Sequence, residues 1–266
     1  MPDLHEMHLH TKEELMPHLF FENISSIPTP PSEDEEISEL QMKIFKSFSK
    51  IMNGSVYVID FHKQCFHFVS DHELFLSEYS LDDALKMGYD FFSKIVYPED
   101  LQLFIGIHRA VLQYLSEPDS NPQEIDYFAF NVRLLNHGLP LMVYHKISLI
   151  FINDCARMAV CHLSGSVIHK SGNLGIYSKD KKKYSSYSFE KHQWQEKKLI
   201  NLTNREKEIL KLAKQGKSNK EISDILCVSE KTIWNTETML YRKLGVHSML
   251  EAVIFATNHG MVFVES

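Results

Sequence analysis

An alternation of apolar and polar positions dominates the sequence after Asn121-Pro122. Every second side chain there is large and apolar at Phe128, Phe130, Val132 and Leu134. That spacing is typical of a strand with one buried face. Turn signals at 136–138 and 153–154 lead into further apolar runs at 141–152 and 157–163. We predict an antiparallel meander of three strands.

Upstream of the meander, the pattern predicts a helix, a hairpin and a helical stretch. From Ser32 to about Lys50, an acidic start is followed by apolar residues at helical spacing: Ile37, Leu40, Ile44, Phe45 and Phe48. Residues 56–61 and 66–70 are β-branched or aromatic and follow an Asn-Gly turn, which predicts a hairpin. Residues 71 to about 116 have a helical pattern.

After residue 199 the sequence carries start and stop signals for four helices. Capping boxes begin the first two helices, at Thr203 with Glu206 and at Ser218 with Glu221. The other signals are Gly216, Ser229, Gly245, Ser248 and Gly260. The short turn between the second and third helices is typical of a helix-turn-helix unit, whose second helix enters the major groove of DNA.

The third of these helices has two distinct sides. Ile233, Leu240 and Leu244 recur at the spacing of a buried stripe. The opposite side carries the residues that we expect to meet DNA: Lys231, Trp234, Asn235, Thr238 and Arg242.

The two halves of the chain differ in charge. Residues 1–178 contain 12 Lys and Arg against 24 Asp and Glu, whereas residues 179–266 contain 16 against 11. An acidic module and a basic module with separate tasks are therefore expected, and the basic one suits a polyanion such as DNA.

Length and pattern together predict two domains in the 266 residues. The fold class is an α+β N-terminal domain, an antiparallel sheet with flanking helices, followed by an all-α C-terminal domain of four helices. The expected segments are an N-terminal arm and amphipathic helix at 1–50, a sensor and dimerisation domain at 51–168, a basic linker with one irregular hairpin at 169–198, and a DNA-binding domain at 199–266.

The order of elements in 51–168 resembles a PAS-type sensor domain, with Tyr97-Pro98-Glu99-Asp100 at the turn before the long helix. The resemblance implies self-association, to which the helix at 32–50 would contribute. The many aromatic residues could line a small-molecule pocket or form an ordinary core, and the second interpretation is favoured.

The C-terminal segment resembles the LuxR-type DNA-binding domain of bacterial transcription factors. The motifs that carry the resemblance are Leu202-Thr203-x-Arg205-Glu206, Asn219-Lys220-Glu221-Ile222, Ser229-x-x-Thr232-Ile233 and Lys243-Leu244-Gly245-Val246. It implies a transcription regulator whose partners are double-stranded DNA and a second copy of the chain. The candidate DNA-binding residues are Lys220, Ser229, Lys231, Thr232, Trp234, Asn235, Thr238 and Arg242.

Three positions of the third helix depart from the family: Trp234, Thr236 and Glu237. A carboxylate at 237 would repel the DNA backbone, whereas Trp234 could contact a thymine methyl group or a sugar. One interpretation is an altered operator; the alternative is an interaction module that no longer reads DNA.

Other chemistries find little support in the sequence. No catalytic motif or phosphate-binding glycine loop occurs, so we predict that the protein is not an enzyme. The grouping of Cys65 and His67 with nearby histidines matches no zinc spacing, and no metal or cofactor is expected. A small-molecule or haem sensor remains an alternative. The absence of a long apolar run or an export signal predicts a cytoplasmic protein.

Overall fold

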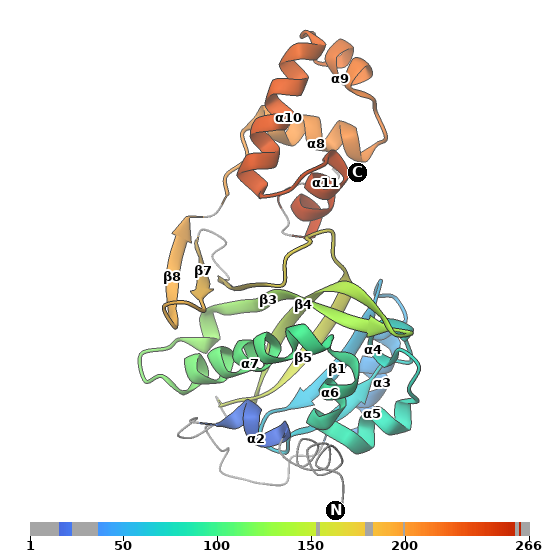
Figure 1. The fold of residues 1–266 in the computed structure, drawn as a ribbon, viewed down its shortest axis with the longest axis vertical. Coiled ribbons are helices and arrows are strands. Elements are labelled where there is room, and N and C mark those ends of the chain that lie inside the picture. Colours follow the sequence, from blue (N-terminus) through green and yellow to red (C-terminus); the bar gives the residue numbers. More distant parts are fainter. Residues whose placement is uncertain are drawn as a thin grey trace, which may run out of the picture. The chain divides into compact units, whose positions relative to one another are not determined.

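The computed structural model divides the chain into two compact units, 1–197 and 198–266 (Figure 1). The structure describes residues 16–22, 37–152, 155–178, 183–198, 200–258 and 261. Within these residues, no helix is both long and apolar enough to cross a membrane.

One sheet of eight strands forms the base of the N-terminal unit, in the order β2-β1-β5-β4-β3-β6-β7-β8. The strands are β1 (Ser55–Asp60), β2 (Cys65–Val69), β3 (Ile125–Asn136), β4 (Leu139–Ile152), β5 (Cys155–Gly165), β6 (Gly172–Ser178), β7 (Lys183–Ser188) and β8 (Gln193–Lys198). The pairs from β2 through β7 are antiparallel. The first five strands confirm the predicted hairpin and meander.

Alternation along β3 produces the buried face that the sequence predicts. Phe128, Phe130 and Val132 are completely buried, and Leu134 is nearly so. Because successive side chains of a strand point to opposite faces, this set fixes which side of β3 meets the core. The register with β4 then places Phe130 opposite His145.

Helices between β2 and β3 supply the other wall of the main core. They are α4 (Glu73–Leu76), α5 (Leu81–Met87), α6 (Phe91–Ile95) and α7 (Leu101–Ser116). Their aromatic residues pack with the sheet; Phe92 on α6, for example, contacts both Tyr57 on β1 and Phe104 on α7. The order of strands and helices that carries the resemblance to PAS-type domains is therefore confirmed.

Helix α3 (Glu39–Ser49) packs on the opposite face of the sheet, where Phe45 meets Phe68 with ring centroids 6.1 Å apart. Its N-cap is Ser38, so it begins later than the predicted start; residues 32–36 lie outside the described residues. The predicted apolar face is divided. Ile37 and Phe45 pack against the sheet, whereas four side chains are exposed: Leu40, Ile44, Phe48 and Ile51.

A short helix in the N-terminal arm, α2 (Met16–Phe21), was not expected. Its Phe20 is completely buried and contacts the rings of Tyr89, Phe104 and His108. The Arg109 guanidinium holds the helix end by donating to the carbonyl oxygen of Leu19 at 2.5 Å. Part of the arm is thus built into the core. The histidines at 5, 8 and 10 lie outside the described residues.

The segment 169–198, for which a linker was predicted, is instead largely sheet. β6 pairs with β3, and β7 and β8 extend the sheet further. Stacked tyrosines reinforce the pairing, with Tyr127 and Tyr177 at a centroid separation of 4.7 Å and Tyr177 and Tyr184 at 5.6 Å. Cross-strand aromatic pairs of this kind stabilise a sheet. The composition of the segment alone did not indicate these pairs. Most of the lysine-rich stretch from Lys179 to Lys183 lies outside the described residues, which resume at 183.

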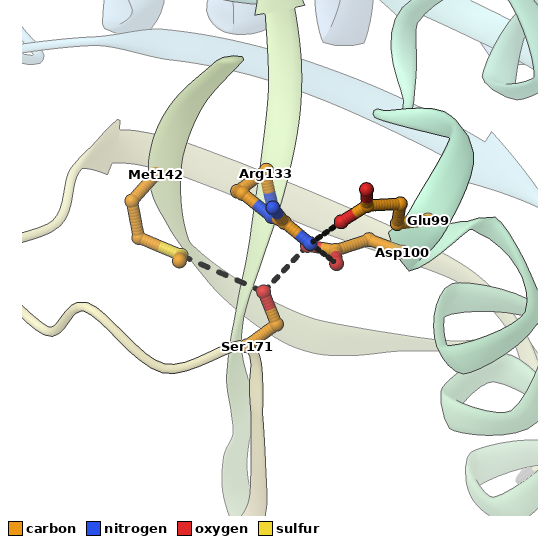
Figure 2. A network of polar contacts seen from close by, with 5 residues as sticks. All are labelled: Glu99, Asp100, Arg133, Met142 and Ser171. Carbon is orange, nitrogen blue, oxygen red and sulfur yellow. Dashed lines mark hydrogen bonds and ion pairs between the residues drawn. The ribbon is translucent and has the colours of Figure 1, made fainter.

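The turn Tyr97-Pro98-Glu99-Asp100 anchors a polar network that joins three parts of this unit (Figure 2). Asp100 is 3% exposed and accepts hydrogen bonds from the Arg133 backbone amide at 2.8 Å and from its guanidinium at 2.5 and 3.1 Å. The Ser171 hydroxyl, just before β6, donates to the same carboxylate at 2.5 Å. Burial alone would raise the pKa of Asp100, but these hydrogen bonds outweigh it and hold the pKa below its ordinary value.

Four helices make up the C-terminal unit: α8 (Asn204–Lys214), α9 (Asn219–Ile225), α10 (Glu230–Leu244) and α11 (Met249–Asn258). Both predicted capping boxes are present, and Gly245 ends α10 in the left-handed conformation at φ +70°. The core contains Ile209, Ile222, Ile233 and Leu240, all completely buried. Ile225, the last residue of α9, is 52% exposed.

Candidate nucleic-acid interface

The connection between α9 and α10 is a short turn held by backbone hydrogen bonds. The Val228 amide donates to the Ser223 carbonyl at 3.0 Å, and Cys227 adopts a positive φ of 51°. The Ser229 hydroxyl then accepts from the Thr232 amide at 3.2 Å and starts α10. This turn fixes the direction in which α10 leaves α9.

The inner side of α10 is anchored in two apolar clusters. Ile233 packs with Ile209 of α8 and Ile222 of α9, whereas Leu240 and Leu244 pack with residues of α8 and α11. Because both ends of the inner side are buried, the helix cannot rotate about its axis without exposing these residues. The opposite side is therefore held outward.

All eight residues predicted to meet DNA are exposed. Lys220 lies in the first turn of α9, Ser229 is the N-cap of α10, and the other six lie on α10. The outward side of α10 brings five of them together: Lys231, Trp234, Asn235, Thr238 and Arg242. Thr232 lies at the edge of this surface beside Ser229, and Lys220 lies apart from it on the other helix. We call these five residues the outer surface of α10.

Hydroxyl groups near the outer surface are already engaged within the domain. The Ser229 and Thr232 hydroxyls share a hydrogen bond of 2.9 Å. The Thr238 hydroxyl donates to the Trp234 carbonyl at 2.9 Å. The donors left on the outer surface are therefore the cations of Lys231 and Arg242, the Asn235 amide and the indole N–H of Trp234.

Glu237 does not belong to the outer surface. It is only 9% exposed and accepts a hydrogen bond of 2.9 Å from the Asn219 side-chain amide of α9. Burial raises the pKa of Glu237 above its ordinary value, and the bond from Asn219 opposes that change. Because the Glu237 side chain is nearly buried, its carboxylate is not placed on the surface where the expected repulsion of DNA would arise. The Asn219–Glu237 contact was missed because nothing in the sequence relates two polar residues on different helices.

Lys243, at the last turn of α10, is likewise turned toward the domain. Its ammonium group donates to Glu206 at 2.8 Å, and the same carboxylate accepts from the Thr203 amide at 2.6 Å. Burial alone would raise the pKa of Glu206, but Lys243 and Thr203 hold the pKa below its ordinary value. This family-motif lysine thus joins α8 to α10.

One family model and several known proteins match part of this chain. Residues 200–256 match the model of the bacterial regulatory proteins of the luxR family. The uncharacterized response regulatory protein YgeK of Escherichia coli is 45% identical over 60 residues, which are 23% of this chain and 41% of that protein. The DNA-binding transcriptional activator DevR/DosR of Mycobacterium tuberculosis is 39% identical over 59 residues, 22% of this chain and 27% of that protein.

The chain spans less than half of the length of these relatives. Among solved structures, the VqmA dimer of Vibrio cholerae aligns over 85% of this chain and 91% of its own, at 15% identity and a TM-score of 0.32. The predicted LuxR-type character of residues 200–256 is confirmed by the family match.

Proposed function

We propose, from the luxR-family match of residues 200–256 and the outer surface of α10, that the protein is a sequence-specific DNA-binding transcription regulator. The observation that carries the proposal is the exposure of Lys231, Asn235 and Arg242 on one side of a helix whose other side is buried. Lysine and arginine suit phosphate oxygens, and asparagine can bond the edge of an adenine in the major groove.

The proposal extends to the individual residues. Lys220, Ser229, Lys231 and Thr232 would lie near phosphates, Trp234, Asn235 and Thr238 near bases, and Arg242 at the far end of the helix. Regulators of this kind act by binding, so we propose that the protein has no catalytic activity and works in the cytoplasm, where its DNA is.

We further propose that the protein binds DNA as a homodimer. Leu40, Ile44 and Phe48 form a stripe on α3 that Ile51, just beyond the helix, extends; the four side chains are 49–76% exposed. On α11, Leu250 is 68% exposed, whereas Met249 and Val253 pack on the core. Apolar stripes of this kind are typical of surfaces that a second subunit covers. A dimer would place two recognition helices in successive major grooves.

The test is selection of bound sequences from a random duplex library by the full-length protein. We expect an enriched site with two half-sites and an affinity that falls steeply with salt, because phosphate contacts release counterions. Failure to enrich any sequence would contradict the proposal and favour a module that only binds other proteins.

On the enriched duplex, two variants should separate the two kinds of contact. Lys231→Ala should weaken cognate and random DNA about equally and reduce the salt slope by about 1. Asn235→Ala should cost about 1–3 kcal/mol on cognate DNA and little on random DNA. Fluorescence anisotropy at several salt concentrations measures both effects. Identical behaviour of the two variants on both duplexes would contradict the assignment of roles.

A second candidate function is the binding of a small uncharged molecule by the N-terminal unit. Among the described residues, the Tyr89 hydroxyl is buried without a hydrogen-bond partner, and neither ring nitrogen of His145 makes a hydrogen bond of ordinary geometry, although the ring interacts with the Val143 backbone. They border one group of packed rings. The ring centroid of Phe104 lies 6.1 Å from that of His145 and 4.4 Å from that of His108, and the His108 centroid lies 6.3 Å from that of Tyr89. Burial lowers the pKa of His108 to about 4 and that of His145 to about 3, so both rings are neutral at pH 7.

Unpartnered polar groups in a core cost roughly 1–3 kcal/mol each, and a ligand that bonded them would recover this energy. We therefore expect His145→Phe to raise the stability of the ligand-free protein by about 1–2 kcal/mol, because Phe keeps the parallel stack on Phe130 at 4.7 Å. Urea unfolding of the full chain measures the change. A destabilised variant would mean that the imidazole is satisfied in the native protein, and the candidate function would lose its support.

A further inference from the structure

Trp234 is a large apolar side chain held outside the folded domain. It is 63% exposed on α10, although the neighbouring Ile233 is completely buried. Isolated apolar residues are common on surfaces. Trp234 differs from most of them because it lies within the residues proposed to face DNA, where a bound duplex would cover it. Trp234 lies one turn after Lys231 and beside Asn235, so it would enter the groove with them.

One neighbour of Trp234 on the outer surface, Thr238, has no free hydroxyl proton. The hydroxyl of Thr238, one turn further along, donates to the Trp234 carbonyl at 2.9 Å. With its proton committed to the helix, Thr238 offers a methyl group and an oxygen acceptor. This part of α10 is therefore suited to an apolar group on the DNA.

The major groove exposes one such group, the C5-methyl of thymine. We propose that Trp234 reads a thymine methyl group next to the base that Asn235 contacts, so that each half-site contains a thymine at that position. The inference rests on the proposed function and names the feature of the operator that this chain's recognition helix would select.

Replacing one thymine at a time by deoxyuridine in the enriched duplex removes a single methyl group and leaves the pairing edge unchanged. We expect one or two positions in each half-site to bind about fourfold more weakly for each methyl group removed. The same substitutions should leave the affinity of Trp234→Ala unchanged, because the contact is already lost. Fluorescence anisotropy on each duplex measures the difference.

Two further variants distinguish the ring from its surroundings. Trp234→Phe removes the indole N–H and keeps an aromatic ring, so it should still lose affinity on deoxyuridine duplexes. Met239→Ala removes another side chain of α10, 67% exposed, and should behave as the wild type does toward deoxyuridine. Since both residues are exposed, each variant should unfold at the wild-type temperature.

The outcomes separate this inference from the function it rests on. If the wild type enriches a site but no deoxyuridine position matters, or if Trp234→Ala keeps the full penalty, Trp234 does not read a methyl group and the regulator proposal stands. Loss of the penalty in Met239→Ala would move the contact to that residue. If the wild type enriches no sequence, both proposals are wrong.

Discussion

Substitution of Asp100 by alanine should lower the free energy of unfolding of the N-terminal unit by about 2–4 kcal/mol. The reason is the set of donors that one buried carboxylate satisfies: the backbone amide and guanidinium of Arg133 and the hydroxyl of Ser171 (Figure 2). Removal of the carboxylate also leaves Ser171, just before β6, without its hydrogen bond to the turn that precedes α7.

The matched control is Glu99→Ala. Glu99 contacts the same guanidinium at 3.2 Å, but its side chain is 70% exposed, so we expect a change below about 0.5 kcal/mol. Urea unfolding can be followed by the fluorescence of Trp194, which lies in the N-terminal unit, in a background where Trp234, the other tryptophan, is replaced by Phe. Equal losses in the free energy of unfolding for Asp100→Ala and Glu99→Ala would contradict the claim that the burial of Asp100 makes its hydrogen bonds strongly stabilising.

The same network gives a dependence on pH with a definite sign. The pKa of Asp100 is lower in the folded protein than in the unfolded chain, so the folded state binds fewer protons. The stabilisation by Asp100 is therefore complete above the ordinary aspartate pKa, about 4, and is lost as the pH falls through the lowered value. Asp100→Asn should show less loss of stability than the wild type over that range of pH. A parallel loss in both proteins would assign the effect to other groups.

The second large effect is expected from α3. Ile44→Asp combined with Phe48→Asp places two charges in the exposed apolar stripe and should convert a dimer to a monomer. Affinity for the duplex with two half-sites should then fall by roughly a hundredfold or more, because the second half-site no longer binds within the same complex. Sedimentation velocity measures the mass, and anisotropy measures the affinity.

Lys43→Glu is the control for charge, since it alters the net charge by the same amount as the two aspartates. Lys43 is 68% exposed and, within the part of the chain that the structure describes, pairs with Glu39 on its own helix at 2.6 Å, so its loss should leave the mass and the affinity nearly unchanged. A double variant that remained dimeric would show that subunits meet elsewhere, with Leu250 of α11 as the next surface to substitute.

Local signals account for the elements that the sequence predicted well. The alternation along β3 and the capping boxes of α8 and α9 depend on residues within a few positions of one another. The missed elements depend on distant partners. Helix α2 has only six residues and is held by the core that Phe20 enters, and β6 is a strand because β3 offers it an edge.

The same distinction holds for the candidate interface. Helical spacing was sufficient to place five of the proposed DNA-binding residues on the exposed side of α10, and the family resemblance supplied Lys220, Ser229 and Thr232, which are also exposed. It was not sufficient for Glu237, whose position depends on Asn219 at a separation of 18 residues. A family comparison alone presents Glu237 as a change in the DNA-facing set, whereas the structure makes it a support between two helices.

That support limits how the recognition helix can be exchanged. A graft of the complete α10 from a relative with another residue at position 237 would leave the Asn219 amide on α9 without its acceptor. Transplanting only the five residues of the outer surface avoids this mismatch. Altered operator preference could thus be built into this scaffold by changing a contact surface while the joint between α9 and α10 stays native.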